Sequence, residues 1–177
     1  MNRLVVLGAG ESGLGAAMLA KREGYAVFVS DGGSIGEARK AQLQAAGIEF
    51  EEGKHDEARI LAADLIIKSP GIPTTVPIVQ QAISRGISVV DELEFASRYS
   101  KGKVIAITGT NGKTTTTLLT YHLLKEAGWD VGLAGNVGKS WAGQLVEQDH
   151  AWWVIEISSF QIDGLVHLKP HIALLTN

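Results

Sequence analysis

The sequence of 177 residues contains no cysteine. Disulfide bonds and thiolate chemistry are therefore excluded within it, which fits a reducing compartment. No stretch approaches the roughly 20 consecutive apolar residues that a membrane-spanning helix needs. The apolar run near the start, Leu4–Leu7, is too short for a signal peptide. We therefore expect a cytoplasmic protein without membrane insertion.

Blocks of a single charge sign are also missing. The 16 lysines and arginines and the 19 aspartates and glutamates are scattered, and the formal net charge is −3. A basic face for nucleic acid is therefore not expected. With 45% hydrophobic and 20% charged residues, the composition is that of a soluble globular protein. The length suffices for one large or two small domains.

Apolar β-branched runs alternate with helical patterns, which predicts an α/β protein with mainly parallel sheets. A strand, a glycine-rich turn and a helix follow one another twice, once at the start of the chain and once at Val104. This repetition favours two nucleotide-type domains. We place them at residues 1–99 and 100–177, joined by the polar segment Ser100–Lys103.

The second unit carries a phosphate-binding pattern. Val104–Ile107 is typical of a buried strand, a glycine turn follows, and Lys113 and Thr114 open the next helix. Glycines let backbone N–H groups approach phosphate oxygens, and a helix N-terminus adds partial positive charge. Lys113 can reach the β- and γ-phosphates, and the Thr114 hydroxyl can bind Mg²⁺. The predicted ATP-binding residues are Gly109, Thr110, Asn111, Gly112, Lys113, Thr114 and Thr115.

One acid interrupts a nearly continuous apolar strand, Trp152–Ile157. A buried carboxylate is costly unless it is paired or bound to a metal. Glu156 stands at the carboxyl end of this strand, the side on which the ATP loop must open. We therefore predict that Glu156 is a Mg²⁺ ligand; the alternatives are a solvated strand-end acid or an ion pair with a lysine.

The first unit opens with a dinucleotide-type pattern. The strand Arg3–Leu7 precedes Gly8, Gly10 and Gly13, which fit G-x-G-x-x-G. Asp31 ends the next strand, where a dinucleotide fold places the acid that binds a ribose hydroxyl. The alternative is a tight turn without a ligand, with Asp31 as a helix cap or a turn residue.

Other polar residues have simpler interpretations. Asp91, Glu92 and Glu94 open a predicted helix that ends near Tyr99, where acids favour the helix N-terminus. We expect them to form a solvated face rather than a carboxylate pair. His55 lies in a polar loop, and we expect it to be solvated rather than metal-bound, because no second ligand stands at close spacing.

The loop Gly109–Thr114 is shorter than the general phosphate loop and resembles that of the Mur ligases and folylpolyglutamate synthetases, which are ATP-dependent amide-bond ligases. Gly8–Gly13 and Ser69–Pro73 resemble the branch of the Mur ligases that adds D-glutamate. There the first domain is dinucleotide-like but holds the UDP part of the substrate. The resemblance implies a Rossmann-like parallel-sheet UDP-binding domain followed by the front half of a P-loop ATPase α/β domain.

The same resemblance assigns residues to the UDP-sugar substrate. It implies that Asp31 lies near the uracil, that Asn136 contacts the sugar–pyrophosphate part, and that Ser158 and Gln161 lie at the muramoyl-alanine end. Gly32 and its neighbour Gly33 depart from the family, which often has hydroxyl and basic residues there, so contacts beyond Asp31 stay open. The implied substrate-binding residues are Gly8, Gly10, Glu11, Ser12, Gly13, Asp31, Ser69, Gly71, Asn136, Ser158 and Gln161.

The reaction implied by the resemblance is a step of peptidoglycan precursor synthesis. ATP phosphorylates the alanine carboxylate of UDP-N-acetylmuramoyl-L-alanine, and the amine of D-glutamate attacks the acyl phosphate. Lys113 and Glu156 would be catalytic, with Mg²⁺ held by Thr114 and Glu156. The full-length enzyme is expected to be monomeric.

The resemblance covers the whole chain but only part of such an enzyme. The family continues with further metal ligands and with a third domain that binds the incoming amino acid. We therefore expect this chain to lack ligase activity alone. We also expect its second sheet to expose apolar surface, so that the chain associates or its second half is loosely ordered.

Other interpretations stay open. The chain could belong to another ligase of the same superfamily, such as an alanine-adding or folylpolyglutamate-type enzyme. It could be an NAD-binding oxidoreductase or a non-catalytic nucleotide-binding regulator. For the loop at Lys113, the simplest alternative is an ordinary turn with a surface lysine.

Overall fold

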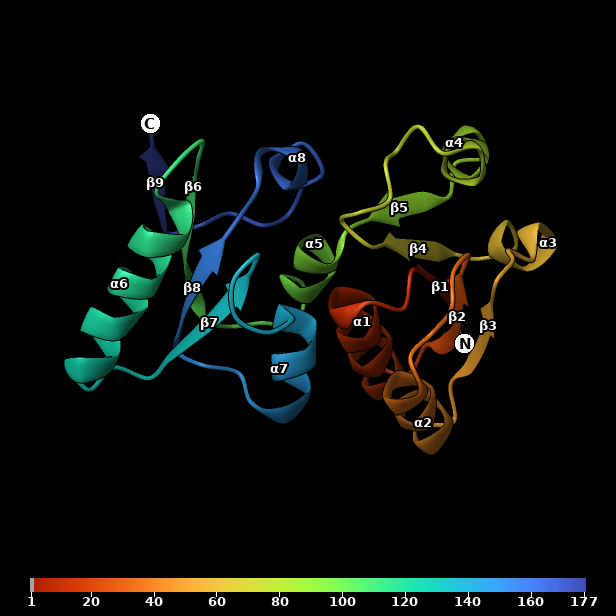
Figure 1. Cartoon of the computed structure of the whole chain (residues 1–177), viewed down its shortest axis with the longest axis horizontal. Coiled ribbons are helices and arrows are strands. Elements are labelled where there is room, and N and C mark those ends of the chain that lie inside the picture. The colour runs from red at the N-terminus through yellow and green to blue at the C-terminus, as the bar shows by residue number, and fades with distance from the viewer. Residues whose placement is uncertain (1) are drawn as a thin grey trace.

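The computed structural model describes residues 2–177; Met1, which the first predicted domain includes, lies outside the described residues. Two parallel sheets stand side by side (Figure 1). The strand order is β3-β2-β1-β4-β5 in the first sheet and β7-β8-β6-β9 in the second. The predicted α/β class with parallel sheets is confirmed. The division of the chain at residue 99 stays a prediction.

The first sheet is built from the first five strands, with a helix after each. The strands are β1 (Arg3–Leu7), β2 (Ala26–Asp31), β3 (Glu49–Glu52), β4 (Leu65–Lys68) and β5 (Ser88–Val90). The helices are α1 (Glu11–Arg22), α2 (Glu37–Ala45), α3 (Glu57–Ile60), α4 (Pro77–Ser84) and α5 (Glu92–Ala96).

Both faces of this sheet are covered, which explains its continuous apolar strands. Alternate residues of β1 point to opposite faces: Leu4 and Val6 join one buried cluster, and Val5 and Leu7 join another. Strands buried on both faces carry apolar runs instead of an alternating pattern. The carboxyl ends of these strands are therefore held on a rigid, doubly covered layer.

The second sheet follows the same plan. Its strands are β6 (Lys103–Gly109), β7 (Val131–Gly135), β8 (Trp152–Glu156) and β9 (Ile172–Thr176). Its helices are α6 (Lys113–Glu126), α7 (Trp141–Glu147) and α8 (Ser159–Ile162), of which the short α8 was not predicted.

The two sheets meet through helices α1, α5 and α7 (Figure 1). Helices α1 and α7 cross closely at Gly15, where a Cβ would lie 2.0 Å from the Ser140 hydroxyl oxygen. The buried indole of Trp141 packs against that of Trp153, with ring centroids 5.9 Å apart. One continuous core therefore spans both units.

The acids of α5 lie inside this junction, so the prediction of a solvated face was wrong. Asp91, Glu92 and Glu94 are only 5%, 3% and 0% exposed. Asp91 accepts a hydrogen bond from the Glu94 N–H at 2.9 Å and caps the helix, which therefore begins at Glu92 and ends at Ala96. Helix α5 packs between the two units, and this packing buries its acids. Sequence spacing alone does not reveal such packing.

Glu92 joins the two units directly. It accepts hydrogen bonds from the Ser140 hydroxyl at 2.8 Å and from the Ala142 N–H at 2.6 Å. Burial raises the pKa of its carboxyl to about 7, because the low-dielectric junction disfavours the charged form.

Glu94 ties α5 to the segment that follows α8. It accepts hydrogen bonds from the N–H groups of Val166 and His167, each at 3.0 Å, and contacts the His167 Nδ1 at 2.6 Å. Burial acts to raise the pKa of Glu94, but these hydrogen bonds outweigh it and lower the pKa below its usual value. Glu94 therefore lies in the junction as a paired carboxylate.

The outer side of the second unit exposes apolar residues. Leu119 and Leu123 of α6 are exposed, and so is Leu175 of β9, which is 79% exposed. The expected association of the chain stays a prediction. Over residues 2–177, no helix combines the length and the apolar character required to cross a membrane.

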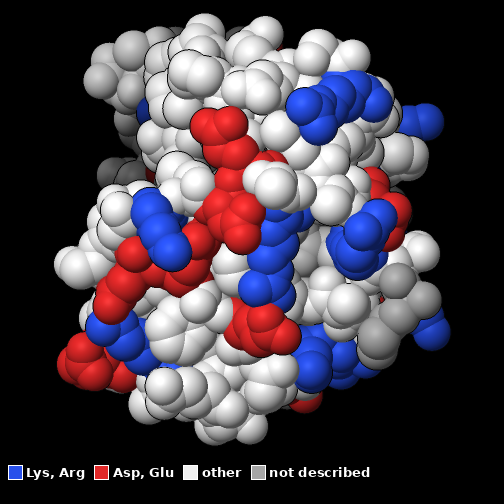
Figure 2. Space-filling view, turned by 90° about the vertical axis from the view of Figure 1, so that its right-hand side faces the viewer, with Lys and Arg blue, Asp and Glu red and all other residues white. Residues whose placement is uncertain are grey.

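The two charge signs are mixed on the outer face of the first unit (Figure 2). Acidic side chains form a band across the middle of this face, and lysines and arginines border it on both sides (Figure 2). Within the first unit, Lys40 forms an ion pair with Glu52, and Arg59 forms one with Glu49.

We predict that Glu92→Gln removes a pH dependence of stability. The pKa of Glu92 rises from an ordinary 4.5 to about 7 on folding, so the folded state holds its proton more tightly. This stabilisation is complete below pH 4.5 and is lost as the pH rises through 7, by about 1.4 kcal/mol per pKa unit. In chemical denaturation, the variant should match wild type at pH 4.5 and exceed it at pH 8.

The matched control is Glu147→Gln, an exposed glutamate on α7, which should keep the wild-type pH profile. A Glu92→Gln variant that follows the wild-type profile at every pH would contradict the assignment.

Candidate functional site

The glycine turn after β1 contains glycines of two kinds. At Gly8 the backbone has φ +88°, and a Cβ on Gly13 would lie 1.9 Å from the Gly8 carbonyl oxygen. These two glycines are required by the local backbone. A Cβ on Gly10 would meet nothing within 4 Å. The space above Gly10, at the N-terminus of α1, is therefore open for an anionic ligand.

Asp31 holds this turn from the end of β2. Its carboxylate accepts hydrogen bonds from the Ala9 N–H at 2.6 Å and from the Gly33 N–H at 2.8 Å. Asp31 therefore has the turn role considered for it, and it caps neither neighbouring helix. Each carboxylate oxygen can accept a second hydrogen bond, so the predicted role in substrate binding stays compatible with these contacts.

The Ser69–Pro73 loop lies against the same turn. The Ser69 hydroxyl donates to the Gly8 carbonyl oxygen at 3.3 Å, and the Ser69 carbonyl accepts from the Ile72 N–H at 2.9 Å. Gly71 has open space where a Cβ would stand. Two predicted loops, far apart in sequence, therefore meet at the carboxyl ends of β1 and β4, where strand order changes direction in the sheet.

The phosphate loop joins β6 to α6. Gly109 has φ +136°, and a Cβ there would lie 1.7 Å from the Thr176 carbonyl oxygen, so glycine is required. Gly112 has φ +79° and precedes α6. The Lys113 ammonium donates to the carbonyls of Gly109 at 2.7 Å and Thr110 at 3.0 Å, so it lies folded over the loop.

The remaining loop residues are exposed around the start of α6. Asn111 donates its N–H to the Asn177 side chain at 3.3 Å, and Thr114 and Thr115 stand exposed in the first turn of α6. The N–H groups of a first helical turn have no partner inside the helix. This end of α6 therefore offers free donors to a phosphate.

Glu156 ends β8 between Ile107 of β6 and Gly135 of β7. It is 5% exposed, and its Oε2 atom has no hydrogen-bond partner. A buried, unpartnered carboxylate oxygen is costly, and a bound cation would remove that cost. The residues present therefore fit Mg²⁺: Glu156 and the Thr114 hydroxyl are the side chains that would hold it.

Ser158 and Gln161 have a structural role that was not predicted, although Ser-x-x-Gln is the sequence signature of a capping box. The Ser158 N–H donates to the Gln161 side-chain oxygen at 2.9 Å, and the Gln161 N–H donates back to the Ser158 hydroxyl oxygen at 3.4 Å. This reciprocal pair is a capping box at the start of α8.

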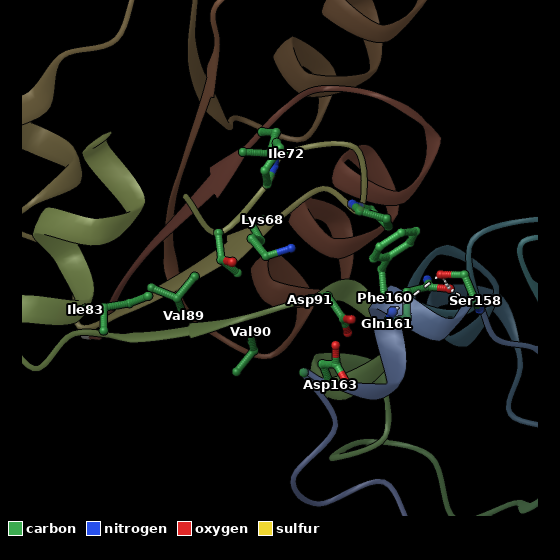
Figure 3. Close-up of a pocket in the computed structure, with 14 residues that line it drawn as sticks. Lys68, Ile72, Ile83, Val89, Val90, Asp91, Ser158, Phe160, Gln161 and Asp163 are labelled. Carbon is green, nitrogen blue, oxygen red and sulfur yellow. Dashed lines mark hydrogen bonds between the residues drawn. The ribbon is translucent and has the colours of Figure 1, made fainter. Parts of the chain in front are cut away.

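A cavity of about 620 Å³ lies between the two units and is lined by Ser158 and Gln161 together with residues of the first unit (Figure 3). Ser158 and Gln161 line one side, from α8, and Lys68 and Ile72 line the other, from β4 and its loop. Lys68 and Asp163 were not singled out by any motif. The signal at Lys68 was a charge ending the apolar strand β4.

Asp91 also lines this cavity, beside Asp163 (Figure 3). Burial raises the pKa of Asp91, although the Glu94 N–H and the charge of Lys68 act to lower it. The cavity is therefore lined by one basic side chain and two acidic ones: Lys68 and Asp91 come from the first unit, and Asp163 comes from the second.

A second cavity, of about 730 Å³, opens between α1, α2 and α7. Glu11 lines it together with Gly138, near the turn that contains Asn136. The Asn136 N–H donates to the Glu156 carbonyl oxygen at 3.0 Å, and Asn136 is exposed. Ser12 lies half-buried in the first turn of α1.

The two parallel sheets, each with a glycine turn after its first strand, match the models of two protein domains. Residues 2–91 match the model of the Mur ligase MurD-like N-terminal domain, and residues 107–177 match that of the Mur ligase middle domain. The chain belongs to the Mur ligase family.

Three curated relatives of the chain share one name. The chain is 53% identical over 175 residues to the UDP-N-acetylmuramoylalanine–D-glutamate ligase of Christiangramia forsetii, covering 99% of this chain and 39% of that protein. The ligase of the same name from Bacteroides fragilis is 52% identical, over 100% of this chain and 40% of its own length. The ligase of that name from Porphyromonas gingivalis is 54% identical, over 98% of this chain and 39% of its own length. The chain therefore spans about 40% of the length of these relatives.

Solved structures show the same fold. The murein peptide ligase of Psychrobacter arcticus aligns over 100% of this chain and 44% of its own, with a TM-score of 0.62 and 25% identity. The UDP-N-acetylmuramate–alanine ligase of Thermotoga maritima aligns over 100% of this chain and 41% of its own, with a TM-score of 0.59 and 22% identity.

We predict that substitution of two glycines of the first turn destabilises the fold by different amounts. Gly13→Ala should lower the melting temperature by the equivalent of about 1–3 kcal/mol or more, because its Cβ would collide with the Gly8 carbonyl. Gly10→Ala should cost less than about 1 kcal/mol, because its Cβ enters open space. Thermal melts of the two variants beside wild type test this. Equal destabilisation by both changes would contradict the assigned roles.

Proposed function

We propose that this chain forms the UDP-substrate-binding part and the first portion of the ATP-binding part of a ligase that adds D-glutamate to UDP-N-acetylmuramoyl-L-alanine in peptidoglycan precursor synthesis. The observation that carries the proposal is the meeting of both units at one cavity, in a chain 52–54% identical to ligases of that name. A substrate on the first sheet would reach the phosphate donor on the second.

The first sheet would hold the nucleotide end of the substrate. The open space at Gly10 suits the pyrophosphate, and Asp31 stands at the end of β2, toward the nucleoside. Further binding residues proposed along the substrate are Gly8, Glu11, Ser12, Gly13, Ser69, Gly71, Asn136, Ser158 and Gln161.

The second sheet would hold ATP. The loop Gly109–Thr115 would surround its phosphates, and the Lys113 ammonium would exchange its two carbonyl contacts for phosphate oxygens. Mg²⁺, held by Thr114 and Glu156, would supply charge neutralisation at the phosphates. Support comes from the unpartnered Glu156 oxygen and from the free donors at the start of α6.

The proposed reaction forms an amide bond through an acyl phosphate. The γ-phosphoryl group of ATP is transferred to the alanine carboxylate, and ADP leaves. The amine of D-glutamate then attacks the carbonyl carbon, phosphate leaves, and the amine proton passes to solvent or a base. Lys113 would stabilise the charge on the transferred group, which is where phosphoryl transfer gains most of its rate.

Several parts of this proposal extend beyond residues 2–177. We assign no D-glutamate site to the described residues, and we propose that the complete ligase acts as a monomer in the cytoplasm. An acid–amino-acid ligase of this kind would use ATP and Mg²⁺.

Thermal melts of this chain with UDP-N-acetylmuramoyl-L-alanine, UDP, NAD⁺ and Mg-ATP test the proposal. A ligand at 100 times its dissociation constant stabilises the folded state by about 2.7 kcal/mol. Stabilisation by the UDP compounds and none by NAD⁺ is the expected result. Stabilisation by NAD⁺ alone would overturn the proposal in favour of an oxidoreductase.

Lys113→Ala should abolish stabilisation by Mg-ATP and preserve that by UDP, because the lost contacts belong to the second unit. In the longer ligase, the same change should reduce turnover at least tenfold, since charge-assisted hydrogen bonds contribute about 1.5–3 kcal/mol each. Lys125→Ala, at the far end of α6, is the matched control and should leave both unchanged. Normal turnover of Lys113→Ala would refute the role.

A further inference from the structure

A hydrogen-bonded chain of three side chains lies at the ends of β2 and β3, outside the two cavities described above. The Ser30 hydroxyl oxygen is 2.7 Å from the Glu51 Oε1 and 2.7 Å from the His55 Nδ1. Ser30 is fully buried, whereas His55 is exposed. The buried serine therefore holds the Nδ1 edge of the imidazole of an exposed histidine.

The direction of the protons follows from the donors available. An ionised carboxylate only accepts, so the single Ser30 proton goes to Glu51, which also accepts from the Asp56 N–H at 2.7 Å. The Ser30 oxygen must then accept, and the Nδ1–H of His55 donates to it. In the neutral imidazole the Nε2 atom consequently carries a lone pair and acts as an acceptor.

The imidazole lies directly beside the glycine that follows Asp31. A Cβ on Gly32 would come within 3.0 Å of the His55 Nε2. The two loops are also tied together: the Gly53 N–H donates to the Gly33 carbonyl at 2.8 Å. A side chain at position 32 would push the ring away, so glycine leaves room for it there.

The order of strands places this nitrogen along the path of a bound nucleotide. Strand β2 lies between β1 and β3 (Figure 1). A ligand whose phosphates sit at Gly10, after β1, would pass Asp31 at the end of β2 and reach His55, which belongs to the loop after β3 and lies against the end of β2. In folds of this kind the nucleoside extends in that direction.

We propose that His55 reads the base of the nucleotide, with its Nε2 accepting a hydrogen bond from the N3–H of uracil. The inference rests on the proposed function, which places a uridine nucleotide on the first sheet. Cytosine has nearly the same shape but presents a lone pair at N3, so two acceptors would face each other. His55 is thus a specificity-determining residue for uracil over cytosine.

Titration of this chain with UDP and with CDP, by calorimetry, tests the inference. Wild type should bind UDP about tenfold more tightly than CDP, the factor expected for one hydrogen bond worth about 1.4 kcal/mol. His55→Ala should bring the ratio of the two affinities close to one. A merely structural loss would weaken both ligands equally and leave the ratio unchanged. The matched control is His122→Ala, an exposed histidine on α6, which should keep the wild-type ratio.

Two further measurements do not depend on removing the ring. Gly32→Ala should displace the imidazole and reduce the same ratio. In wild type, the ¹⁵N resonance of the His55 Nε2 should move on addition of UDP and stay in place on addition of CDP. Equal affinities of wild type for UDP and CDP would overturn this inference alone. So would a ratio of the two affinities that His55→Ala leaves unchanged. Failure of wild type to bind UDP at all would overturn it together with the proposed function.

Discussion

The contact on which the site depends is the hydrogen-bonded junction of Glu92 with Ser140 and Ala142. Helix α5 ends the first unit, and α7 belongs to the second, so this buried carboxylate fixes one sheet relative to the other. Removing the partners would leave an unsatisfied carboxylate away from water, which is far more costly than the contact itself is favourable. The cavities between the units owe their walls to this arrangement.

Around that junction, small residues set the distances. Gly15 allows α1 and α7 to touch, and Gly13 allows α1 to approach the end of β1. Gly109 allows the phosphate loop to pass β9. At Gly10 and Gly71 the same residue type leaves open space instead. Glycine therefore serves two separate purposes here, close packing at some positions and access for a ligand at others.

Much of the fold could be predicted because its signals are local. The strand Arg3–Leu7 has the predicted bounds, since an apolar run and the glycine turn that follows it define the strand. Helix α5 was predicted too long at both ends: the Asp91 side chain caps the helix and is not part of it, and residues 97–99 form a turn after Ala96. The short α8 was missed, since a single turn has too few residues to show a period.

The sequence by itself determined the order of the strands, helices and glycine turns, and with them the family. Only the tertiary structure decided which charged groups are buried and what they touch. Glu94 meets His167, and Ser30 meets His55 and Glu51, across long stretches of chain. Burial and hydrogen bonding depend on such distant neighbours, and the period of a local pattern contains no information about them.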